Sequence, residues 1–109
     1  MKAIVIITIS LFAASAISAR AADAKANWDT NCVQCHGKNG SADTKMGKTL
    51  NAKDLTDAKV QADFTDAQAA TAIHDGVKEG GKTRMKAFGE KLTADEIKAL
   101  VAYVRTLKK

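Results

Sequence analysis

The sequence has 109 residues, with 17 Lys and Arg against 12 Asp and Glu, two Cys, two His and no Pro. This length allows one small domain and excludes a multidomain enzyme. The formal net charge is +5, but the Lys residues alternate with acidic ones instead of forming a basic run, which argues against nucleic acid as a partner.

A signal-like segment opens the chain. A positively charged start precedes an apolar run over residues 3–14, and small residues continue to Ala21. This order is typical of a secretory signal peptide. We predict a signal peptide over residues 1–21, cleaved after Ala21 or alternatively after Ala19, and a single domain over residues 22–109.

The alternative for this segment is an uncleaved anchor helix. The apolar run is shorter than the roughly 18 apolar residues that a membrane span usually needs, and Thr8 and Ser10 interrupt it. Cleavage is therefore favoured, and the mature domain is expected in the periplasm without stable membrane insertion. Because cleavage removes Lys2 and Arg20, the mature domain is only mildly basic.

A first helix is expected over residues 24–32, where it carries Trp28. It leads into Cys32, Cys35 and His36, which form a C-x-x-C-H sequence, the pattern for covalent attachment of a c-type haem. On a helical turn the two thiols lie on one edge, and the His that follows points its imidazole at the iron from the same side. We therefore predict one covalently attached haem c, with Cys32 and Cys35 as the thioether residues and His36 as the proximal iron ligand.

Three other roles for the two cysteines remain open. A thioredoxin-like redox motif needs a β-α-β pattern. No run of alternating or β-branched residues in this sequence is long enough to predict a strand. A structural zinc site needs four ligands, and the distant His74 is the one His left outside the motif. A disulfide between Cys32 and Cys35 would close a loop too short to constrain much of the chain.

The middle of the chain alternates between loops and short helices. Residues 37–50 and 76–92 hold all seven glycines and are predicted to be loops. A short helical turn is expected over residues 56–62. A longer helix should begin at Thr65, where a Thr-x-x-Gln sequence forms a capping box, and end at Gly76.

The last helix has the clearest signal. Thr93 and Glu96 form a second capping box, and apolar residues follow at helical spacing. These apolar residues are Ile97, Leu100, Val101, Val104 and Leu107. The domain is therefore predicted to be all-α, with helices and loops wrapped around one covalently bound haem.

The sixth position on the iron separates electron transfer from ligand binding. Met85 lies in a loop between two predicted helices, far enough from His36 to reach the opposite haem face. Met46 follows His36 too closely for the chain to cross to that face, and His74 lies near the end of a helix. We predict Met85 as the distal iron ligand, with a buried thioether that fills a gap as its alternative role.

Three segments, taken in order, resemble a small bacterial class I cytochrome c, which is monohaem and His/Met-ligated. They are the haem motif, the loop over residues 85–89 and the stretch over residues 100–105. The resemblance implies the small cytochrome c fold and a periplasmic one-electron carrier. Such a carrier cycles its haem between ferrous and ferric states and shuttles electrons between respiratory or photosynthetic complexes. We expect a monomer that is not an enzyme.

The resemblance also implies that the first and last helices cross. In this family the crossing is made by a small residue and aromatic contacts. Here Ala24 and Trp28 would meet Leu100 and Tyr103.

The chain departs from the family at the residue after the ligand Met. Pro is common there, whereas Lys86 stands in this sequence, and a loop without a fixed φ loses some pre-organisation. In the family a carbonyl next to a proline often accepts the ring N–H of the proximal His. Without any proline, the acceptor for His36 stays unassigned.

The partner surface is expected at the exposed haem edge. Basic residues in or beside the two predicted loops would steer redox proteins with acidic surfaces, or form an ordinary solvated surface. They are Lys38, Lys45, Lys48, Lys82, Arg84, Lys86 and Lys91. Two other functions remain open: the haem subunit of a larger dehydrogenase or oxidase, and a five-coordinate haem protein that binds ligands or acts like a peroxidase.

Overall fold

The computed structural model describes the backbone of residues 15–109 and the side chains of residues 23–109. The apolar run predicted to lie within the signal peptide, residues 3–14, falls outside the described part of the chain. Within that part, no helix is both long and apolar enough to span a membrane.

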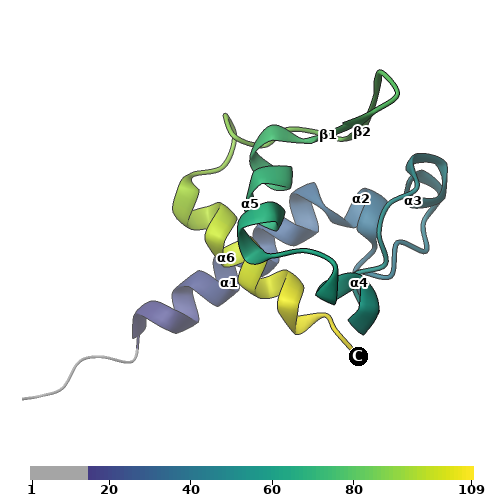
Figure 1. Cartoon of the computed structure of the whole chain (residues 1–109). Coiled ribbons are helices and arrows are strands. Elements are labelled where there is room, and N and C mark those ends of the chain that lie inside the picture. Colours follow the sequence, from purple (N-terminus) through teal and green to yellow (C-terminus); the bar gives the residue numbers. More distant parts are fainter. Residues whose placement is uncertain (1–14) are drawn as a thin grey trace, which may run out of the picture.

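The described chain is mostly helical and carries one small antiparallel sheet (Figure 1). Its elements, in order, are α1 (Ser15–Asn31), α2 (Val33–His36), α3 (Lys45–Leu50), α4 (Ala58–Ala62), α5 (Asp66–Asp75), β1 (Val77–Glu79), β2 (Lys82–Met85) and α6 (Ala94–Thr106).

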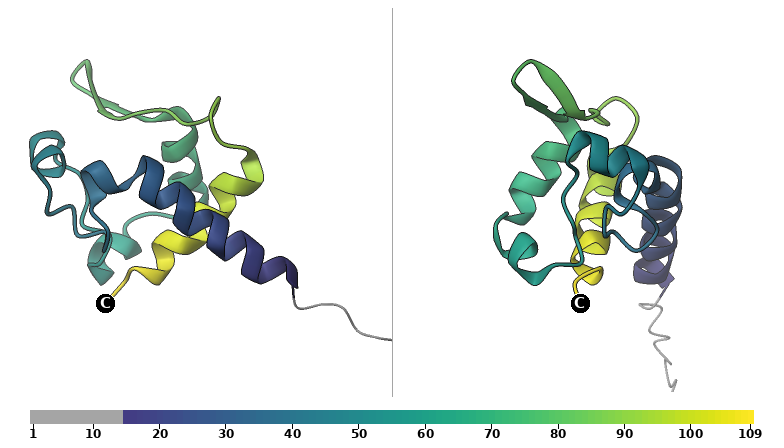
Figure 2. Two further views of the ribbon diagram at one scale, coloured as in Figure 1. Left: turned by 180° about the vertical axis from the view of Figure 1, so that it is seen from behind. Right: turned by 90° about the vertical axis from the view of Figure 1, so that its right-hand side faces the viewer.

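Helices α1 and α6 cross and form the centre of the fold (Figure 2). Trp28 and Leu100 are each 1% exposed, and Ala24 is also buried. The rings of Trp28 and Tyr103 lie 5.5 Å apart at a tilted angle, a favourable aromatic geometry. The predicted contact between these two aromatic residues is therefore confirmed.

The two predicted capping boxes are present. The side chain of Thr65 accepts a hydrogen bond from the backbone N–H of Gln68 at the start of α5, and Gly76 ends that helix. Thr93 and Glu96 form the same reciprocal pair at the start of α6. Both predictions are confirmed, because the two partners of each capping box lie only three residues apart and the sequence shows them directly.

The prediction of two long loops was wrong. Helix α3 forms within residues 37–50 because the Thr44 side chain caps it, accepting from the N–H of Gly47. Strands β1 and β2 form within residues 76–92, joined by a turn in which Gly80 and Gly81 have positive φ. The expectation that the chain has no strand is therefore also wrong. The two segments that the glycine turn joins are too short and too polar to show a strand pattern in the sequence.

Other boundaries also differ from the prediction. Helix α1 begins at Ser15 and not near residue 24, so it runs through the predicted cleavage position at Ala21. The short turn expected over residues 56–62 is present as α4.

A buried polar network joins α4 and the start of α5 to α6. The Gln61 amide donates to the carbonyls of Leu55 and Val104, at 2.7 and 2.8 Å. Arg105 donates to the Gln61 side chain and to the Phe64 carbonyl, each at 2.8 Å, and its guanidinium lies 4.4 Å above the Phe64 ring centroid. Because the network satisfies the Leu55 and Phe64 carbonyls and gives the Val104 carbonyl a second donor, it fixes these elements together.

Candidate functional site

The C-x-x-C-H motif forms one tight helical turn after α1. The Cys32 N–H donates to the Trp28 carbonyl, and the His36 N–H donates to the Cys32 carbonyl, both at 2.9 Å. Gly37, with φ of +79°, ends the turn by donating to the Val33 carbonyl. The short helix thus places the predicted attachment and ligand residues on one continuous turn.

Both cysteines are half-buried and unbonded. Burial raises the pKa of the Cys32 thiol to about 11, and the neighbouring Cys35 adds to this rise. The described residues contain no group of three or more His, Cys, Asp and Glu arranged to hold a metal ion.

His36 is held by a backbone acceptor that the sequence left unassigned. Its Nδ1 lies 3.2 Å from the carbonyl oxygen of Lys53. Because a carbonyl oxygen can only accept, Nδ1 carries the hydrogen and Nε2 keeps a free lone pair. Burial lowers the pKa of the imidazole, and the hydrogen bond to Lys53 opposes this only in part. The ring is therefore neutral and oriented, as an iron ligand must be.

Helix α3 and its N-cap residue pack against the backbone of the C-x-x-C-H motif. The Thr44 hydroxyl donates to the Cys35 carbonyl at 2.6 Å. A Cβ at Gly47 would collide with that same carbonyl oxygen and lie 2.6 Å from the carbonyl oxygen of Ala42. Glycine is therefore required at this position for α3 to approach the motif so closely.

Met85 ends β2 and is half-buried, and both Met85 and Cys32 pack against the hydrophobic core. Its backbone passes directly over Gly76, where a Cβ would lie 2.6 Å from the Met85 carbonyl oxygen. The chain after it is held by the end of α5: the Phe88 N–H donates to the Ile73 carbonyl at 2.9 Å. These contacts hold the backbone on both sides of Lys86.

The two other candidate ligands have different surroundings. Met46 is 39% exposed on α3. The His74 ring is exposed, its Nδ1 lies 2.6 Å from the Asp75 carboxylate, and it covers Gly89 closely. Of the three, Met85 is the one whose side chain packs against the core that Cys32 also contacts.

Two residues of the predicted basic surface lie close to acidic side chains of the same chain. Six of its seven residues are exposed, whereas Arg84 is half-buried. Lys48 pairs with Asp43 at 3.0 Å, and Arg84 Nε lies 3.9 Å from Glu79. The Lys48–Asp43 pair is exposed on both sides and contributes little to stability.

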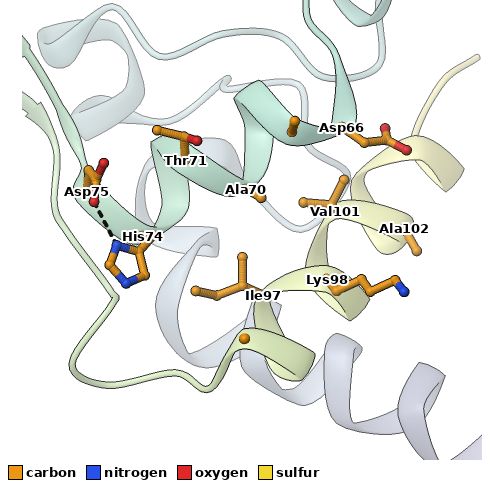
Figure 3. Close-up of a pocket in the computed structure, with 11 residues that line it drawn as sticks. Asp66, Ala70, Thr71, His74, Asp75, Ile97, Lys98, Val101 and Ala102 are labelled. Atoms are coloured by element: carbon orange, nitrogen blue, oxygen red, sulfur yellow. Dashed lines mark hydrogen bonds and ion pairs between the residues drawn. The ribbon is translucent and has the colours of Figure 1, made fainter.

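A hollow of about 550 Å³ lies elsewhere, between α5 and α6 (Figure 3). Its walls are mostly small and apolar side chains such as Ala70, Ile97 and Val101, with His74 at one end. None of the motif residues nor Met85 lines it. This hollow is therefore distinct from the predicted haem site.

The donor set around the motif fits a haem. Two free thiols, an oriented neutral imidazole and a half-buried thioether are the groups that attach and ligate a c-type haem. In the described residues, two buried side-chain donors also have no partner, Trp28 Nε1 and Arg84 Nε. Buried donors are normally paired, so unpaired donors near the motif and beside Met85 fit a bound group that has acceptor atoms.

Known proteins match over most of the chain. The family described as cytochrome c oxidase, cbb3-type, subunit III matches residues 19–104. The cbb3-type cytochrome c oxidase subunit FixP of Azorhizobium caulinodans is 38% identical over 77 residues, which cover 71% of this chain and 24% of FixP. The chain thus spans about a quarter of this curated relative.

Two solved structures have the same fold. The KustC0563 c-type cytochrome has a TM-score of 0.72 and 38% identity, and the match covers 80% of this chain and 99% of that structure. A point mutant of the same cytochrome has a TM-score of 0.69 and 37% identity, with 79% and 99% coverage. The described helices are therefore arranged as in c-type cytochromes.

Proposed function

This chain belongs to the cytochrome c family described as cytochrome c oxidase, cbb3-type, subunit III, and we propose on that premise that it is a periplasmic one-electron carrier with a single haem c. The family implies a covalently bound haem and an electron-transfer role. The periplasmic location, the single haem and the lack of enzymatic activity belong to our proposal.

Three groups of residues in the chain would attach the haem, ligate its iron and orient the ligands. Cys32 and Cys35 would hold the haem through thioether bonds, and His36 and Met85 would bind the iron from its two faces. When bound, the haem supplies a reversible one-electron change between ferrous and ferric iron. Burial keeps the His36 ring neutral, and the Lys53 carbonyl orients it.

One observation carries the proposal: the Met85 loop is fixed by backbone contacts at the end of α5. Gly76 lies under the Met85 carbonyl, and Phe88 and Gly89 donate to carbonyls in the last turn of α5. A fixed thioether favours permanent two-sided ligation, which keeps small molecules off the iron and supports electron transfer over ligand binding.

A second candidate is the haem subunit of a larger oxidase. FixP, which shares 38% identity with this chain, is a subunit of a cbb3-type oxidase, and the matched part is 24% of its length. The chain would then act as a relay within a complex. Isolation from its host as a stable assembly would favour this role over that of a free carrier.

The proposal is tested by exporting the full chain in a host that attaches haem. We expect one covalent haem per chain by mass and a single one-electron redox transition. Cys32→Ser and Cys35→Ser should each lose one thioether bond, whereas the exposed Lys38→Ser control should retain both. A chain that carries no haem, or that binds zinc at the motif, would overturn the proposal.

A further inference from the structure

Arg84 is an unusual residue for the end of a short surface hairpin. Its Nε is buried and has no hydrogen-bond partner within the described part of the chain. The nearest carboxylate is Glu79, whose oxygen lies 3.9 Å away and whose side chain is 69% exposed. A distance of 3.9 Å is too long for a hydrogen bond, so a buried donor on a permanent cation stays unsatisfied.

The hairpin is irregular at this residue. Val77 pairs with Met85 and Lys78 pairs with Thr83, so Arg84 has no partner of its own across the ladder. An extra residue of this kind is a β-bulge, which re-aims side chains and is over-represented next to functional sites.

The bulge changes which way Arg84 faces. In a regular strand, neighbouring side chains point to opposite faces. In β2, however, Arg84 and Met85 are both half-buried while Lys82 and Thr83 are exposed. The bulge therefore turns the guanidinium toward the protein together with the Met85 thioether instead of leaving it in solvent.

We propose that Arg84 binds a carboxylate of the haem through its buried Nε–H. This inference rests on the proposed function, in which Met85 ligates the haem iron. A haem carries ionised carboxylates, and the guanidinium fork matches a carboxylate better than any other side chain does. Two neighbouring residues of β2 would then bind the same haem: Met85 binds the iron, and Arg84 binds a carboxylate at the haem edge.

The pairing has an electrostatic consequence. A fixed cation beside the haem favours the ferrous state, which carries one positive charge less than the ferric state. The contribution of Arg84 should exceed that of an exposed lysine, because a buried charge is screened less by solvent and salt.

The test compares Arg84→Gln with Lys78→Gln in the haem-loaded full chain. Lys78 is exposed on β1, so its variant removes the same charge without touching the proposed contact. At mildly alkaline pH, where the carboxylate is ionised, Arg84→Gln should lower the reduction potential by more than Lys78→Gln does. Redox infrared difference spectra with haem isotope-labelled at its carboxylates should show a shifted carboxylate band in Arg84→Gln and an unshifted band in Lys78→Gln.

Two further variants keep the result interpretable. Arg84→Lys retains the charge but not the fork, so its potential should stay near that of the parent while the carboxylate band shifts. If Arg84 instead pairs with Glu79 and not with the haem, the haem carboxylate band would be unchanged in Arg84→Gln and in Glu79→Gln alike, and the inference would be wrong.

The outcomes also separate this inference from the proposed function. A parent with covalent haem and Met ligation, whose potential and carboxylate band are unchanged in Arg84→Gln, would overturn the role of Arg84 alone. A parent that lacks covalent haem would overturn both.

Discussion

At the scale of single residues, Gly76 decides where the backbone of Met85 can lie. Its φ is +75°, and a Cβ there would lie 2.6 Å from the Met85 carbonyl oxygen and 2.9 Å from the Ala87 nitrogen. Glycine is therefore needed twice, for its backbone conformation and for the close approach.

We predict that Gly76→Ala displaces Met85 and weakens its bond to the iron. The ferric protein should lose intensity in its sulfur-to-iron charge-transfer band, measured by optical absorption. Gly81→Ala is a matched control, because Gly81 has φ of +77° and a Cβ there would meet no atom within 4 Å. Equal band intensities in both variants would show that the close approach to Gly76 does not position Met85.

The proposed site combines residues that are close in the sequence with groups that only the fold brings together. Cys32, Cys35 and His36 lie within five residues, so their spacing alone predicts a haem attachment motif. The acceptor for His36 is the main-chain carbonyl of Lys53, and any residue type can supply a carbonyl. The fold alone brings such a group into place, so no sequence pattern could have identified it.

At the scale of helices and strands, the same distinction holds. The capping boxes of α5 and α6 were predicted correctly because the two residues that form each box lie three positions apart in the sequence. The β1–β2 hairpin was missed because its strands have three and four residues and are mostly polar. The strands are joined by a turn of two glycines with positive φ, a signal that hydrophobic periodicity does not report.

Glu96 gives the start of α6 a pH dependence. The Thr93 N–H is the main cause that lowers the pKa of this carboxyl, and the Asn27 amide on α1 lowers it further. A lowered pKa in the folded state means that the carboxylate stabilises the fold above its ordinary pKa of 4.5 and loses this contribution as the pH falls through the folded value.

We predict that Glu96→Gln lowers the thermal midpoint at neutral pH and that this difference shrinks as the pH falls below 4.5. Gln68 occupies the same position in the capping box of α5, so Gln keeps the geometry and the variant isolates the charge. Asp95→Asn, in the same helical turn, serves as a control for the general effect of a negative charge near a helix start. A difference between parent and Glu96→Gln that is constant across pH would contradict the prediction.

At the scale of the whole molecule, three contacts hold the site together. The crossing of α1 and α6 places the start of the motif, α3 supports its end, and α5 fixes the Met85 loop (Figures 1 and 2). Gln61 and Arg105 then join α4 and the start of α5 to α6. The two predicted iron ligands, His36 and Met85, therefore come from segments that are far apart in the sequence and are held by different helices.

We predict that Gln61→Leu destabilises the fold by about 1–3 kcal/mol, because it leaves the buried Leu55 carbonyl without its donor and removes the side-chain acceptor of Arg105. Chemical unfolding of the haem-loaded protein measures this loss. Lys59→Ala, an exposed change on the same helix, should stay within about 0.5 kcal/mol of the parent. Equal stabilities for both variants would show that the network is not needed to join these helices.

The most direct test of the electron-carrier assignment is the optical spectrum of the haem-loaded protein in both oxidation states, for the parent and for Met85→Ala, with and without CO. We expect a sulfur-to-iron charge-transfer band in the ferric parent that Met85→Ala lacks, and CO binding by the variant alone. A parent that lacks the band and binds CO readily would contradict Met85 ligation and indicate a ligand-binding or catalytic haem protein.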